Sequence, residues 1–62
     1  MTPSEVQQKL SEECPDYQFV VGETAGGAFI SVVQGDFLWQ RSNMTTAESC
    51  YRAAKTMIAA RG

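Results

Sequence analysis

Two segments typical of helix starts lie towards opposite ends of this 62-residue chain, and three strand-like runs lie between them. In each segment a threonine is followed three positions later by a glutamate, first at Thr2 and Glu5 and again at Thr45 and Glu48. In such a capping box, the two side chains bond amide donors that the first turn of a helix leaves unpaired. The sequence therefore predicts two helices that flank a sheet, in the order α-β-β-β-α.

The first helix is expected to begin after Thr2, with Pro3 at the position where a missing N–H does no harm. Pro15 disfavours helical backbone at the residue before it, so the helix should end at Cys14 or just before. Residues at a spacing of four form a narrow apolar stripe along it. The stripe consists of Val6, Leu10 and Cys14.

Three runs rich in aromatic and β-branched residues predict strands at Tyr17–Gly22, Ala28–Gln34 and Phe37–Arg41. Gly35 indicates a tight hairpin whose turn is centred on Gln34–Gly35 or on Gly35–Asp36. Side chains alternate along a strand, so both turns give the same two faces. One face carries Ile30, Val32, Phe37 and Trp39, and the other carries Phe29, Ser31, Val33, Leu38 and Gln40.

The last helix is expected to begin at Thr45 or Thr46 and to run towards Arg61 and Gly62. Many residues of its apolar stripe are small, which allows a close approach to the sheet. That stripe consists of Ala47, Cys50, Tyr51, Ala54, Met57 and Ile58.

A chain of this length has room for one domain, residues 1–62, with one core. We expect an α+β fold in which both helices pack on one face of a three-stranded antiparallel sheet, the face with Ile30 and Trp39. Phe29, Val33 and Leu38 would then face outwards, together with Val20 or with the alternate residues of the first strand, Tyr17, Phe19 and Val21. In the alternative arrangement the helices divide between the two faces and bury both.

Composition gives general limits on location and charge. No apolar run is long enough to span a bilayer and the N-terminus does not resemble a signal peptide, so we expect a cytoplasmic protein. There, Cys14 and Cys50 are expected to be reduced thiols, with a disulfide as the alternative.

The net charge of −2 divides into −5 over residues 1–36 and +3 over residues 37–62. That division can steer a charged partner, or both sets can be ordinary solvated surface.

The sequence contains no motif that is typical of a catalytic site. The chain has no histidine, its two cysteines match no zinc spacing, and the glycines at 22, 26 and 27 precede a strand rather than a helix that could hold a phosphate. Cys14 has no neighbouring cation that would lower its pKa, and Cys50 lies on the apolar stripe of the last helix, so neither resembles an activated nucleophile. We therefore expect a protein that is not an enzyme and that uses no cofactor or metal.

The leading hypothesis is a small module that binds another protein, because an uncovered apolar sheet face more often marks a contact than a free surface. Its candidate contacts are the outward residues Phe29, Val33 and Leu38, the edge strand, and the acidic residues Glu12, Glu13, Asp16 and Glu23. Compact acidic chains of this kind are typical of inhibitors that phages and mobile elements direct against host defence complexes, including CRISPR systems. A homodimer built on the same surface is a further possibility.

The alternative hypothesis is a homodimeric nucleic-acid-binding accessory or regulatory protein that uses the sheet and the basic last helix. Its candidate residues are Trp39, Arg41, Arg52 and Lys55. The segment from Phe37 to Ala54 is similar to the strand-turn-helix part of DNA-binding modules of the AP2 and integrase arm-binding type, a resemblance that covers less than a third of the chain. Few cations and an acidic total charge argue against this hypothesis, since nucleic-acid affinity comes largely from phosphate neutralisation.

Overall fold

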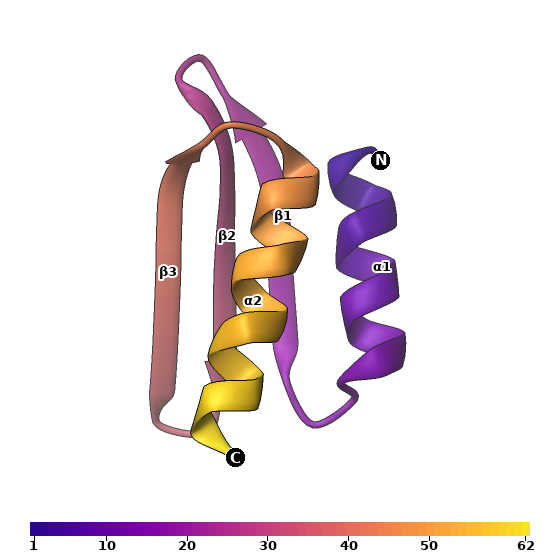
Figure 1. The fold of residues 1–62 in the computed structure, drawn as a ribbon, viewed down its shortest axis with the longest axis vertical. Helices are drawn as coiled ribbons and strands as arrows, with labels where there is room; N and C mark the ends of the chain where they lie inside the picture. Colours follow the sequence, from indigo (N-terminus) through magenta and orange to yellow (C-terminus); the bar gives the residue numbers. More distant parts are fainter.

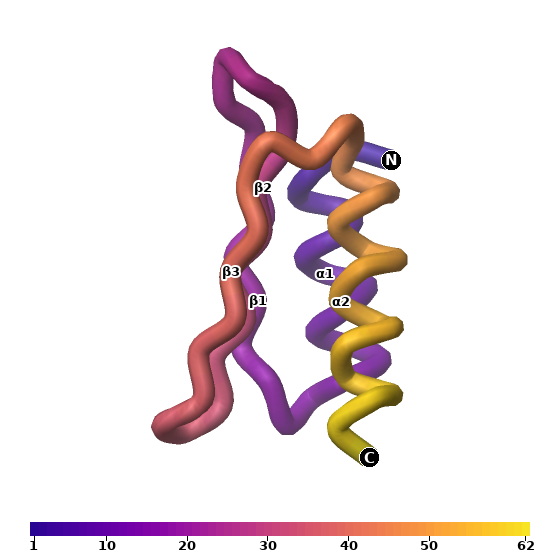
Figure 2. The backbone as a smooth tube through the Cα atoms, turned by 60° about the vertical axis from the view of Figure 1, so that its left-hand side comes forward, coloured from indigo at the N-terminus to yellow at the C-terminus, as the bar shows by residue number.

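The five elements follow one another with short connections, and the computed structural model describes all 62 residues. They are α1 (Pro3–Glu13), β1 (Gln18–Thr24), β2 (Gly27–Gln34), β3 (Phe37–Met44) and α2 (Ala47–Arg61). The strands are antiparallel and lie in the order β1-β2-β3, with β3 at the edge farthest from α1 (Figure 1). Both helices lie on the same side of the sheet (Figure 2). The predicted α-β-β-β-α fold is therefore confirmed.

The first helix begins and ends where the sequence predicts. The Oγ1 atom of Thr2 accepts a hydrogen bond from the backbone N–H of Glu5 at 3.2 Å, and the Glu5 carboxylate accepts one from the N–H of Thr2 at 2.8 Å. The bond from the Thr2 backbone lowers the pKa of Glu5 below its ordinary value of 4.5. At the other end, the N–H of Cys14 caps the helix by donating to the carbonyl of Leu10.

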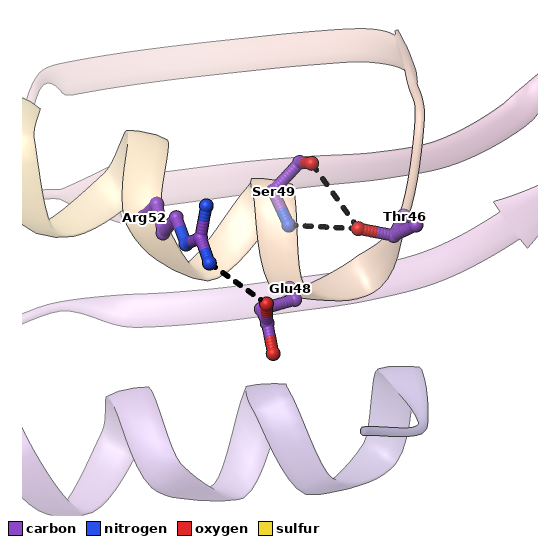
Figure 3. A network of polar contacts seen from close by, with 4 residues as sticks. All are labelled: Thr46, Glu48, Ser49 and Arg52. Carbon is purple, nitrogen blue, oxygen red and sulfur yellow. Dashed lines mark hydrogen bonds and ion pairs between the residues drawn. The ribbon is translucent and has the colours of Figure 1, made fainter.

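The second predicted capping box, at Thr45 and Glu48, does not form, whereas Thr46, one of the two predicted starts of this helix, is confirmed as its cap. Thr46 caps α2, and its Oγ1 accepts from the N–H of Ser49 at 3.1 Å (Figure 3). Glu48 is therefore the second residue of the helix rather than the third, and at that position its side chain does not reach back to the cap. It instead accepts a hydrogen bond from Arg52 one turn later, at 3.0 Å.

The register of the second hairpin shows which of the two predicted turns is correct. Gln34 pairs with Phe37, so the turn is Gly35–Asp36. Gly35 has a φ of 58° and Asp36 has no positive φ, the pattern of a type II′ turn with glycine at its first position. Val32 then lies opposite Trp39 and Val33 opposite Leu38, so these two pairs occupy opposite faces, as predicted.

The strands extend further than their composition suggests. Thr24 pairs with Gly27, which leaves only Ala25–Gly26 as the turn between β1 and β2. β3 continues to Met44 through an irregularity in which two of its residues lie opposite Phe29, and Asn43 there has a φ of 57°. Pairing with a neighbouring strand thus overrides the weak strand preference of these polar and glycine residues.

The core lies between the sheet and the two helices. α1 packs on β1, while α2 contacts all three strands and α1. The largest fully buried side chains are Leu10, Ile30, Val6, Val32 and Cys50. Each buried Val, Leu or Ile contributes about 1.5–3 kcal/mol relative to an exposed one. Neither helix is long and apolar enough to cross a bilayer.

Candidate functional site

The sheet face that points away from the helices is uncovered. The register places no charged residue on it, although Arg41 at the sheet edge borders a hollow there with Phe29, Ser31 and Gln40. The register places on it Gln18, Val20, Phe29, Ser31, Val33, Leu38 and Gln40, which we call the open face. Val20 and Leu38 are 55% and 58% exposed, whereas Phe29 and Val33 are half-buried. Of the two predicted contributions from the first strand, Val20 is therefore the correct one, because Phe19 and Val21 belong to the core.

Phe29 is a half-buried member of the predicted open-face contacts. It pairs with Gly22 on β1, and a Cβ atom on Gly22 would lie 2.6 Å from Cε1 of the ring. The ring therefore uses the space that a side chain at position 22 would occupy. Val33 pairs with Leu38 and lies diagonally from Val20, so these three residues form one apolar group on the face.

Both edge strands have a backbone group bonded to a side chain. On β1, the N–H of Val21 donates to the Oε1 atom of Gln7 in α1 at 3.0 Å. On β3, the carbonyl of Gln40 accepts from the Nη1 atom of Arg41 at 2.9 Å. These bonds occupy edge groups that a strand of another molecule would need for pairing. The irregularity at Asn43 also hinders such pairing along β3. The predicted use of an edge strand is thus less well supported than use of the open face.

The four predicted acidic contacts do not form one cluster. Glu12 and Glu13 end α1, and Asp16 is exposed in the loop after it, whereas Glu23 lies near the far end of β1 (Figure 1). Glu12 is exposed and accepts a hydrogen bond from Gln8 at 3.3 Å. The charge division along the chain thus does not give one continuous acidic surface.

Glu13 holds the two helices together. Its Oε1 atom accepts a hydrogen bond from the Tyr51 hydroxyl at 2.6 Å and lies 3.1 Å from Nζ of Lys55. The Tyr51 bond, and then the Lys55 bond, lower the pKa of Glu13, while the same contacts raise the pKa values of Tyr51 and Lys55. Lys9 adds a cation over the Tyr51 ring, 5.1 Å from its centroid. Glu13 and Lys55 are therefore engaged within the chain.

Three of the four residues predicted for nucleic acid line one groove between β3 and α2. This groove has a volume of about 540 Å³ and is lined by Trp39, Arg41, Arg52, Ala53, Thr56 and Met57, which we call the β3–α2 groove. The guanidinium of Arg41 lies 4.8 Å from the centre of the Trp39 ring. Lys55 is absent from the groove because it faces Glu13 of α1.

Arg61 makes contacts that the sequence did not indicate. Its guanidinium lies 3.7 Å from the centre of the Phe37 ring and donates to Gln34 and to the Tyr17 hydroxyl at 3.1 and 3.2 Å. Its position in the last turn of α2 also complements the helix dipole. No local pattern could have revealed these contacts, since its partners lie 24 to 44 positions earlier in the chain.

The two cysteines are free thiols. Cys50 is fully buried, and burial raises the pKa of its thiol, which opposes formation of a reactive thiolate. Cys14 is half-buried beside the core. No group of three histidine, cysteine, aspartate or glutamate side chains is placed to hold a metal ion.

Comparison with family models, curated proteins and solved structures found no match to this chain. The resemblance of residues 37–54 to DNA-binding modules therefore gains no support from a related protein.

Proposed function

We propose that this protein is an interaction module that binds a protein partner through its open face. One observation supports this above the others: Val20 and Leu38 are more than half exposed on a sheet face that no helix covers. Apolar side chains grouped on one surface favour contact with a partner, because association removes them from water. The bonded edge groups on Val21 and Gln40 favour use of the face over use of an edge.

A second copy of the chain is the partner that this face fits most directly. The protein has a net charge of −2, yet the open face contains only apolar and uncharged polar side chains. Two copies that pack face to face would therefore bring no like charges together there. A two-fold arrangement would place the apolar group of Val20, Val33 and Leu38 against the same residues of the second copy.

The experiment is a light-scattering measurement of molar mass on a sizing column across a concentration series. The wild-type chain is expected to approach twice its monomer mass of 6.8 kDa as its concentration rises. The double variant V20T/L38T should stay monomeric, because threonine keeps the strand preference and removes apolar contact area. Gln18→Ser, on the same face, is the matched control and should behave as the wild type.

Unfolding curves for the three proteins separate loss of association from loss of the fold. A wild-type chain that remains monomeric at the highest attainable concentration would contradict self-association. In that case the face would require a different protein, found by capture from a lysate with the wild type and lost with V20T/L38T. Capture that is equally strong with both proteins would contradict a role of the open face altogether.

The narrower hypothesis, an inhibitor of a host defence complex, rests on the small size, acidic composition and lack of a catalytic pattern. A cytoplasmic location and reduced thiols belong to the same hypothesis. The molar-mass and capture experiments test the open face first, because both self-association and binding of a host protein depend on it.

A further inference from the structure

The β3–α2 groove lies on the helical side of the sheet, opposite the open face, and Arg41 at the sheet edge borders both surfaces. It forms because α2 packs on the middle of the sheet and leaves part of β3 uncovered. Trp39, which lies opposite the fully buried Val32, is only half-buried as a result. The groove combines an aromatic ring, the apolar side chains of Met57 and Ala53, and two guanidinium groups.

We propose that this groove binds an acidic peptide segment of a partner protein. Arg41 and Arg52 would pair with carboxylates of the segment, and Trp39 and Met57 would contact its neighbouring apolar side chains. Charge complementarity is the basis for this choice, since the groove has two cations and no acidic residue among those that line it. The planar guanidinium group presents a fork of donors that matches a carboxylate.

Arg41 is held in place before any ligand binds. Its guanidinium lies over the Trp39 ring at 4.8 Å, and Nη1 donates to the carbonyl of Gln40 at 2.9 Å. It forms no ion pair within the chain. Because a guanidinium has five N–H donors, most of those on Arg41 are available to a ligand. Less side-chain freedom is lost on binding when a donor is already positioned.

Arg52 can exchange one carboxylate for another. It pairs with Glu48 at 3.0 Å, and the two side chains are 76% and 50% exposed. Exposed pairs one helical turn apart contribute little to stability. A ligand carboxylate can therefore replace Glu48 at little cost, and the ordered Arg41 beside the same groove provides a second point of contact.

A peptide fits the groove better than a nucleic acid does. The other three cations lie elsewhere: Lys9 lies over the Tyr51 ring, Lys55 pairs with Glu13, and Arg61 contacts Phe37 at the C-terminal end of α2. A nucleic-acid strand would thus meet two cations on a protein whose net charge is −2, which releases few counterions. One or two carboxylates next to apolar side chains match both the charge and the apolar lining of the groove.

The test uses Trp39, because it is the only tryptophan in the chain and its fluorescence reports directly on the groove. The probe is a fluorescein-labelled decapeptide of alternating glutamate and leucine, followed by anisotropy and by Trp39 emission. The comparison ligands are the same peptide with lysine for glutamate and a single-stranded oligothymidine of ten nucleotides. We expect saturable binding of the glutamate peptide alone, and weaker binding as salt is raised.

Arg41→Gln and Arg52→Gln should each weaken binding of the glutamate peptide by about tenfold, because each removes a charge-assisted contact. Lys9→Gln removes one positive charge from α1 and serves as the matched control, which should bind as the wild type. The variant V20T/L38T should also bind normally, so failure of the open face and failure of the groove are distinguishable. Equal binding by Arg41→Gln and the wild type, no binding at all, or tighter binding of oligothymidine would overturn the proposal.

Discussion

The ring of Phe29 on β2 lies so close to the backbone of Gly22, its register partner on β1, that a side chain at position 22 would fit only if the ring moved. A Cβ atom there would lie 2.6 and 2.7 Å from the Cε1 and Cζ atoms of the ring. These atoms are at the far end of an aromatic side chain on the open face, so the ring can turn outward. A ring packed inside the core could not move in this way. Gly22 therefore determines how much of Phe29 the open face exposes.

Gly22→Ala is expected to turn the Phe29 ring outward and to strengthen self-association. The free energy of unfolding should change by less than about 1 kcal/mol. Alanine lowers the conformational entropy of the unfolded chain relative to glycine, which stabilises the fold and offsets the loss of the ring contact. The measurement is the ring chemical shifts of Phe29 by NMR, together with molar mass by light scattering. Ring shifts identical to those of the wild type would contradict this role of Gly22.

Gly27→Ala should destabilise the fold by at least about 2 kcal/mol, since backbone strain and overpacking both contribute. Gly27 has a φ of 135°, and a Cβ atom there would clash with the backbone carbonyl oxygen of Met44. Gly35→Ala is the matched control, because Gly35 also has a positive φ but nothing lies within 4 Å of its Cβ position. Gly35→Ala should cost only the backbone strain of a positive φ, about 1–3 kcal/mol, and less than Gly27→Ala. Urea unfolding of both variants measures the difference.

Thr46→Ala should lower the free energy of unfolding by about 1 kcal/mol, because it removes the oxygen that accepts from the N–H of Ser49. Thr45→Ala is expected to change it by less than about 0.5 kcal/mol, since the exposed Thr45 side chain caps nothing. In a domain of this size the first change corresponds to a fall in Tm of about 4–8 °C. A larger effect at Thr45 than at Thr46 would mean that α2 begins one residue earlier.

Glu13→Gln should reduce stability at neutral pH and have less effect in acid. The folded state lowers the pKa of Glu13, so its contribution is fully present above the ordinary value of 4.5 and is lost as pH falls through the folded value. The pKa values of Tyr51 and Lys55 are raised from 10.0 and 10.5, so their contribution is lost only as pH rises through the raised values. The difference between wild type and variant should therefore be largest between about pH 5 and pH 9.

Urea unfolding at pH 3 and pH 7 measures this difference. Glu12→Gln is the matched control, because it removes the same charge from the neighbouring position and leaves the contact between the helices intact. Its unfolding free energy at pH 7 should remain close to that of the wild type. An equal loss of stability in Glu12→Gln and Glu13→Gln would show that net charge, rather than the contact with Tyr51 and Lys55, is responsible.

Interactions between residues close together in the sequence were sufficient to predict the order of helices and strands and the two faces of the sheet. Thr2 with Glu5, and Pro15 after Cys14, determine the limits of α1 through backbone hydrogen bonding and steric clash. Gly35 allows the tight turn, and strict alternation then assigns Val32 and Val33 to opposite faces. These features depend on residues a few positions apart, so the sequence alone predicts them.

Tertiary structure alone decided which charged groups meet and which are left for a ligand. Glu13 and Tyr51 are 38 positions apart, and they meet only because both helices pack side by side on one sheet face. The same packing directs Lys55 towards α1 and leaves Arg52 beside Trp39 and Arg41 in the β3–α2 groove. Sequence patterns are governed by neighbours along the chain, whereas these contacts depend on the position and rotation of α2 over the sheet, which the packing of its small side chains determines.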